Sequence, residues 1–329
     1  MNRSISRSRI NILDANVANE IINAIKIPKN AIVFDINPGS GMLTHALLQN
    51  KNVKKVFSLE PLKHIVSYLQ PLKEELQHRY DVFEVDPMLE ADFLNKKEDF
   101  SDIPISSWEM GHPSLISVSQ IPFGKMGDQM ISSIISMIYD KWGLQSFGRI
   151  PMYLITHSRQ AERLLSGEGD NKRSQLNLFA EGLGDMELLQ IFKDGFYPKG
   201  EYALLDLKPF ITPKITVPWQ TYQYVVSHLL VKRKGKVEEM IRTLGAGTEK
   251  LLKDLSFDSK TLITNLTVEQ FNEIAEKYDN WPFKPEVLLY PFDPFYKIVS
   301  DSDIKQVLEK KELVDMSHIN VKDQECYMR

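Results

Sequence analysis

The sequence predicts an α/β fold of the Rossmann-like type, followed by a small helical domain and an extended tail. Three observations carry this prediction. A short apolar segment runs into a glycine-containing turn and a helix start, strand-like and helix-like segments alternate up to residue 207, and periodicity becomes purely helical after the proline-rich stretch 209–218. At 329 residues, the chain is long enough for one large domain and a smaller one.

The first strand, turn and helix form the most informative unit. Residues 31–34 are a short apolar run suited to a buried parallel strand, and Asp35 ends it. Gly39 and Gly41 allow the backbone to approach a ligand closely, and 42–48 continues with helical periodicity. The full GxGxxG spacing of a pyrophosphate binder is absent. An ordinary strand-to-helix turn and a turn that holds an adenosine-type ligand therefore both remain open.

The same alternation continues along the chain. Further strands are expected at 55–59, 80–85, 114–118, 151–156, 188–192 and 203–207, and helices at 62–76 and 127–142. The connection at 196–200 is short enough for an antiparallel hairpin between the last two strands. The order predicts a mostly parallel sheet with one antiparallel pair.

After the proline-rich stretch, helices are expected at 219–231, 236–244, 248–255 and 267–278, with a charged helix near 303–313. Thr267 and Gln270 have the spacing of an N-cap and its capping-box partner. We therefore place the sheet domain at 1–213, the helical domain at 214–285 and the tail at 286–329.

Composition excludes several classes of protein. A net charge of −4 and a pI of about 6.0 argue against a free-standing binder of a large nucleic acid, which would neutralise many phosphates with Lys and Arg. Apolar runs stop short of the ~18 residues that a spanning helix needs. Cys326 is the single cysteine, and the seven histidines lack ligand spacing. We expect no membrane partner and no metal site.

The first ten residues are basic and rich in serine. Arg3, Arg7 and Arg9 alternate with serines, and no acid precedes Asp14. This composition is typical of a short mitochondrial import signal, and equally of a frayed basic terminus.

Four polar residues stand at the ends of successive predicted strands: Asp35, Glu60, Asp86 and Gln120. An open α/β sheet binds its ligand at that edge. An acid after the second strand can accept both ribose hydroxyls, and an Asp after the third can accept from an adenine amino group. Each could instead cap a helix, but their recurrence favours a nucleoside site.

In these positions the chain resembles the ribosomal RNA adenine dimethyltransferases, over residues 11 to about 283. The resemblance implies a Rossmann-like, S-adenosylmethionine-dependent methyltransferase fold. Its motifs fall at 11–14, 35–39, 120–123, 158–165, 174–176, 196–198 and 266–271. The family's cofactor contacts then correspond to Asn11, Leu13, Asp35, Asn37, Gly39, Glu60, Asp86 and Gln120.

The catalytic block departs from the family pattern. Gln120, Pro122 and Phe123 stand where the family uses Asn, Pro and an aromatic residue to hold the adenine. The extra methylene of Gln120 displaces the amide, and a misplacement near 1 Å can cost on the order of 10²-fold in rate. Asn37 also replaces a glycine and would crowd the methionine part of the cofactor. These departures favour a chain without methyl transfer, in which S-adenosylmethionine is an inherited ligand and no cofactor is required.

Within the same family, the chain is similar to fungal mitochondrial transcription initiation factors of the transcription factor B type. Segments 142–149 and 281–286 carry this similarity. It implies a mitochondrial matrix or nucleoid protein that binds a single-subunit, phage-type RNA polymerase, helps melt the promoter and traps the non-template strand, with RNA as a further ligand. The alternatives are an active rRNA adenine N6-dimethyltransferase and a polymerase-independent RNA-binding protein.

Candidate nucleic-acid contacts combine two basic stretches with one aromatic residue that the sequence suggests is exposed. They are Lys172, Arg173, Lys232, Arg233, Lys234, Lys236 and Trp108. The basic residues are equally compatible with a solvated surface, and Trp108 with a packed loop anchor.

Overall fold

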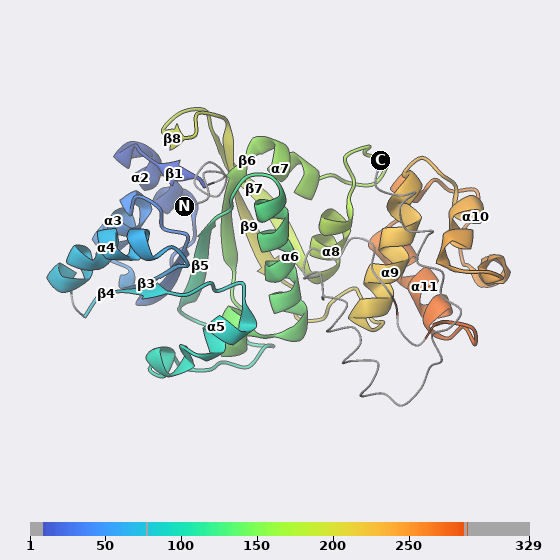
Figure 1. Ribbon diagram of the computed structural model, residues 1–329, viewed down its shortest axis with the longest axis horizontal. Coiled ribbons are helices and arrows are strands. Elements are labelled where there is room, and N and C mark those ends of the chain that lie inside the picture. Colours follow the sequence, from blue (N-terminus) through green and yellow to red (C-terminus); the bar gives the residue numbers. More distant parts are fainter. Residues whose placement is uncertain (1–8, 77, 286–287, 289–329) are drawn as a thin grey trace, which may run out of the picture. The chain divides into compact units, whose positions relative to one another are not determined.

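The computed structural model describes residues 9–76, 78–285 and 288 (Figure 1). A seven-stranded sheet has the order β4-β3-β2-β5-β6-β9-β7. Its strands are β2 (Ala31–Ile36), β3 (Val53–Glu60), β4 (Tyr80–Glu84), β5 (Leu115–Gln120), β6 (Met152–His157), β7 (Gly184–Phe192) and β9 (Tyr202–Pro209). Neighbours from β4 to β6 pair in parallel, whereas β9 is antiparallel to both β6 and β7. The predicted Rossmann-like sheet is confirmed, as is the antiparallel pairing of its last two strands, and β9 forms a second antiparallel pairing with β6 that was not predicted.

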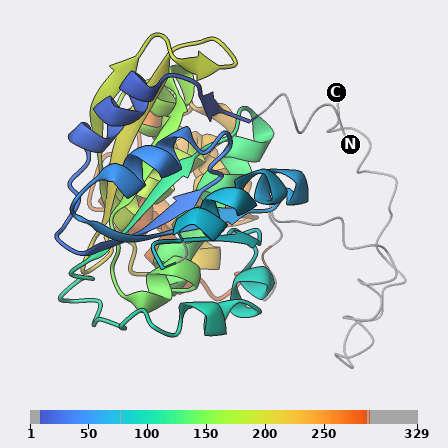
Figure 2. The ribbon, with the colours of Figure 1, turned by 90° about the vertical axis from the view of Figure 1, so that its left-hand side faces the viewer.

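Helices cover both faces of this sheet because successive strand residues point to opposite sides. Val33 and Val56 pack into one core with the helices α2 (Ala15–Ala24), α3 (Met42–Gln49) and α4 (Lys63–Leu76), which face the viewer in Figure 2. Phe34 and Phe57 pack into the other core with α5 (Glu90–Leu94), α6 (Lys125–Asp140) and α8 (Gln175–Leu183). The sequence prediction omitted α2, α5, α8 and the short α7 (Ser158–Leu164).

Residues 196–200 do more than connect two strands. Phe196–Tyr197 forms β8, which pairs antiparallel with β1 (Asn11–Ile12) near the start of the chain. The backbone N–H of Leu13 extends this ribbon by donating to the carbonyl of Gly195 at 2.8 Å. The expected antiparallel hairpin is confirmed by the pairing of β7 with β9, and a partner distant in sequence orders its connection in addition.

The helical segment shares a core with the sheet domain. It contains α9 (Trp219–Leu229), α10 (Val237–Met240) and α11 (Val268–Asp279), and the capping box of Thr267 and Gln270 is confirmed. Phe179 of α8 contacts Trp219 with ring centroids 4.9 Å apart. The expected helix at 236–244 is one α-helical turn followed by a 3₁₀ turn, and Thr248–Asp254 is entirely 3₁₀.

The expected domain boundaries stay predictions. The charged helix near 303–313 and the tail at 286–329 lie outside the described residues, apart from position 288. Within the described part of the chain, no helix combines the length and the apolar character needed to cross a bilayer.

Gly127 should be intolerant of a side chain. A Cβ there would overlap the carbonyl oxygen of Pro122, a backbone atom that has little freedom to move. We expect Gly127→Ala to lower the free energy of unfolding by roughly 1–3 kcal/mol in urea titrations. Gly167→Ala is the matched control, since a Cβ at Gly167 meets nothing within 4 Å. Equal stability of the two variants would contradict this packing.

Candidate functional site

Asp35 is one of two fully buried acids at the carboxyl edge of the sheet. It is the penultimate residue of β2 and has no exposed surface. Thr44 of α3 donates from Oγ1 to Asp35 Oδ2 at 2.5 Å. Its Oδ1 has no hydrogen-bond partner among the described residues. Burial raises the pKa of Asp35 to about 7, against the opposing hydrogen bond from Thr44 and with a further upward contribution from Glu60.

Glu60, at the end of the neighbouring strand β3, is already engaged by the protein. Arg9 donates from Nη1 to Glu60 Oε2 at 2.6 Å, and the backbone N–H of Leu62 donates to Oε1 at 2.9 Å. The exposed fraction is 7% for Arg9 and zero for Glu60. Burial raises the pKa of Glu60, and the charge of Arg9 is the largest opposing influence.

Asp86 follows β4 and is more accessible than the other two acids. Its Oδ1 accepts the backbone N–H of Met88 at 3.0 Å, which shapes the turn after the strand. Burial raises the pKa of Asp86, and among the smaller influences the negative charge of Asp92 raises it while Arg9 lowers it. Arg9 thus interacts electrostatically with both Glu60 and Asp86.

The turn after β2 is filled by the Asn37 side chain and packs against β1. Asn37 has a left-handed backbone with φ of 57°, which Asn tolerates better than most residues. Its Nδ2 donates to the backbone carbonyl of Gln120 at 3.1 Å and lies 3.3 Å from Met130 Sδ. A Cβ built on Gly39 would lie 2.5 Å from Oδ1 of Asn11, so this glycine allows β1 to rest on the turn.

The block after β5 is packed rather than open. Gln120 is 2% exposed, and its Oε1 has no partner among the described residues. Pro122 is buried, with its carbonyl against Gly127 at the start of α6. The ring of Phe123 contacts those of His157 and Tyr202, at centroid distances of 5.4 and 5.8 Å.

S-adenosylmethionine does not fit this arrangement in the way that the sequence resemblance implies. The Gly39 turn and the partly exposed Asp86 are compatible with it. Both oxygens of Glu60, the expected ribose acceptor, already accept hydrogen bonds, and the side chain of Asn37 fills the turn. Leu13, an expected contact, is 57% exposed and only its backbone is engaged. The cofactor roles of these residues stay predictions.

Two expected nucleic-acid contacts are buried. Trp108 is 8% exposed, its Nε1 donates to the carbonyls of Phe210 and Ile211, and Lys141 Nζ lies 5.0 Å from the ring centroid. The expectation of an exposed indole is therefore wrong, because long-range packing makes Trp108 a loop anchor.

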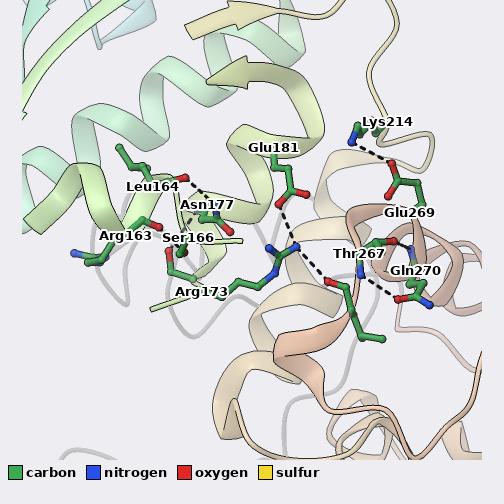
Figure 3. Close-up of polar contacts among 12 residues, drawn as sticks. Arg163, Leu164, Ser166, Arg173, Asn177, Glu181, Lys214, Thr267, Glu269 and Gln270 are labelled. Carbon is green, nitrogen blue, oxygen red and sulfur yellow. Dashed lines mark hydrogen bonds and ion pairs between the residues drawn. The ribbon is translucent and has the colours of Figure 1, made fainter. Parts of the chain in front are cut away.

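Arg173 has no exposed surface and pairs with Glu181 at 3.1 Å (Figure 3). Its Nη2 also donates to the carbonyl of Leu266, which ties the loop before α8 to the helical segment. A buried and paired guanidinium is unavailable to a phosphate, so its inclusion among the nucleic-acid contacts was wrong.

The remaining basic candidates lie at or near the surface, and the fold brings the two stretches together. Arg233 donates from Nη1 to the carbonyl of Asn171, beside Lys172. Lys172 pairs with Glu162 at 2.5 Å and Lys232 with Glu239 at 3.5 Å. Lys234 is exposed and Lys236 is partly buried. This surface is basic but partly neutralised.

Sequence reasoning missed Arg9 and Thr44 as residues of this edge. Thr44 lies in the first turn of α3, where it donates to Asp35, and could have been found from helical spacing. No spacing in the sequence connects Arg9 to the strand ends. Within the described residues, no group of three or more His, Cys, Asp or Glu side chains is placed to hold a metal ion.

Comparison with known proteins identifies relatives across most of the chain. A family model described as ribosomal RNA adenine dimethylase matches residues 8–280. The mitochondrial dimethyladenosine transferase 1 of Vermamoeba vermiformis is 26% identical over 316 residues, covering 84% of this chain and 90% of that protein. The Bos taurus protein of the same description is 25% identical, covering 81% and 79%. A dimethyladenosine transferase structure from Plasmodium falciparum shares the fold, with a TM-score of 0.59 at 15% identity, over 82% of this chain and 97% of that one.

Replacing Arg173 should test its structural role. Arg173→Met leaves Glu181 and the Leu266 carbonyl without their partner, so we expect a loss of about 3 kcal/mol in the free energy of unfolding. Lys172→Met, at the exposed neighbour, should change stability little. If Arg173→Met instead weakened nucleic-acid binding at unchanged stability, the structural assignment would be contradicted.

Asp35 should make stability depend on pH. Its pKa of about 7 in the folded protein exceeds the ordinary 3.8, so the folded state holds a proton that the unfolded state releases in that interval. The contribution of Asp35 to stability therefore falls as pH rises from about 4 to about 7. Asp35→Asn should remove this fall, so that the free energy of unfolding of the variant rises relative to that of wild type between about pH 4 and about pH 7 in urea titrations. Parallel pH profiles would argue against a protonated Asp35.

Proposed function

Because the chain belongs to the ribosomal RNA adenine dimethylase family, we propose that it is a mitochondrial member that has exchanged methyl transfer for transcription initiation. In this role it assists a single-subunit RNA polymerase in promoter recognition and melting, and it stabilises the open complex by binding the unpaired non-template strand. A mitochondrial location is supported by the descriptions of its relatives as mitochondrial.

The packing of the block at 120–123 carries this proposal. Methyl transfer in the family needs an amide and a carbonyl that reach the adenine amino group. Here the Gln120 side chain is 2% exposed, and the Pro122 carbonyl is covered by the first turn of α6. Because the reaction depends on placing a weak nucleophile within a fraction of an ångström, this packing is unfavourable for catalysis.

Surface features support a role with a protein partner and a nucleic acid. Trp281 and Phe283 line a pocket of about 530 Å³, and the Phe283 side chain is 73% exposed. Exposed aromatic residues of this kind favour a protein contact. A weakly basic surface suffices for nucleic acid when a polymerase supplies most of the phosphate contacts.

The second candidate is an rRNA adenine N6-dimethyltransferase, as the relatives are described. Two buried oxygens without a hydrogen-bond partner among the described residues, Asp35 Oδ1 and Gln120 Oε1, favour the methyltransferase, because a bound ligand can supply the missing hydrogen bonds. S-adenosylmethionine would then be the methyl donor, and Asp86 a contact to its adenine.

Transcription and methylation assays on the same preparation separate the two candidates. We expect the wild-type protein to stimulate initiation by its cognate polymerase on a linear mitochondrial promoter, without transferring methyl groups to a small-subunit rRNA helix. Asp86→Asn keeps the hydrogen bond from Met88 available but removes a carboxylate from the nucleoside edge. This variant should therefore initiate transcription as well as wild type.

Methyl transfer that is lost in Asp86→Asn, together with no stimulation of initiation by wild type, would overturn the proposal in favour of the enzyme. Stimulation that depends on Asp86 would mean that the nucleoside edge itself contributes to initiation.

A further inference from the structure

We propose that Arg9 is a built-in cation that occupies the ribose end of the nucleoside site and excludes an adenosine ligand until it is displaced. This inference concerns the ligand site alone and does not depend on transcription initiation being the function of the protein.

Charge balance gives the first argument. Asp35, Glu60 and Asp86 lie on consecutive strand ends, and burial raises the pKa of each. Buried carboxylates require a compensating cation or a proton. A cationic ligand could supply the charge, but here the guanidinium of Arg9 supplies it from within the chain.

Geometry gives the second argument. The Arg9 Nη1 atom lies 2.6 Å from Glu60 Oε2, the distance of a short charge-assisted hydrogen bond. A ribose hydroxyl that donates to this oxygen would need the same space. The other oxygen of Glu60 is held by the backbone N–H of Leu62. The ion pair therefore competes with a nucleoside for the charge of Glu60 and for part of its capacity to accept hydrogen bonds.

The segment that follows Arg9 packs against the turn after β2. A Cβ on Gly39 would lie only 3.3 Å from the carbonyl oxygen of Ile10 and 2.5 Å from Asn11 Oδ1. Ser40 of the same turn donates to the carbonyl of Ile12 at 2.7 Å. The segment that follows Arg9 is thus attached to the turn that would cradle the ligand.

The Arg9 side chain can nevertheless be displaced from Glu60. The Nε of Arg9 is buried without a hydrogen-bond partner among the described residues, so the guanidinium depends mainly on its charge interactions. Moving it into water restores its hydration, which offsets part of the cost of breaking the pair. Arg9 therefore sets the affinity of the site and does not abolish it.

Calorimetric titration with S-adenosylhomocysteine tests this inference directly. We expect wild type to bind weakly and Arg9→Met and Arg9→Gln to bind about 10- to 100-fold more tightly, because the ribose no longer competes with a cation. Arg242→Met removes an exposed arginine from the helical segment and should bind like wild type. Circular dichroism establishes that each variant is folded, and Arg9→Gln retains an amide that can donate to Glu60.

Equal or weaker binding by folded Arg9 variants would overturn the inference, as would wild-type binding as tight as that of Arg9→Gln. If neither Arg9 variant folds, the wild-type titration decides, since saturable tight binding contradicts a closed site and its absence supports one. Transcription plays no part in this readout. The outcome of the S-adenosylhomocysteine titration is therefore distinguishable from failure of the proposed function.

Discussion

The carboxyl edge of the sheet is organised around two acids with no exposed surface, Asp35 and Glu60, on adjacent parallel strands. Ionised carboxylates in such a position are costly unless they are protonated, paired or hydrogen-bonded. The protein uses all three solutions: a raised pKa at Asp35, an ion pair from Arg9, and hydrogen bonds from Thr44 and the Leu62 backbone. Arg9 and α3 both contribute contacts that meet this requirement.

The same requirement bears on the predicted nucleoside site. Asp35 and Glu60 stand at strand ends where the sequence predicts a nucleoside site, yet polar contacts at this edge are made by the chain itself. Asn37 bonds to the backbone of Gln120, and Arg9 pairs with Glu60. These contacts hold the β2 turn and the segment after Arg9 together, while Asp35 Oδ1 and Gln120 Oε1 have no hydrogen-bond partner among the described residues.

Strand positions, the antiparallel pair and the Thr267 capping box were predictable, because each depends on residues close in sequence. The four strand-end residues were also predictable as a group, since parallel strands bring their carboxyl ends to one edge. Trp108 and Arg173 were misjudged as surface contacts. Their burial comes from partners about a hundred residues away, the carbonyls of Phe210 and Leu266, which local pattern cannot reveal.

The sequence alone determined the fold class, the order of the strands along the chain and the family resemblance, because periodicity and motif order are local properties of the chain. Only the tertiary structure decided which polar groups meet. It brought Arg9 to Glu60 across 51 positions and placed β1 against β8, so that Arg9 became part of the carboxyl edge of the sheet. The physical reason is that charge pairing in a buried site depends on three-dimensional proximity and desolvation, and neither can be read from spacing along the chain.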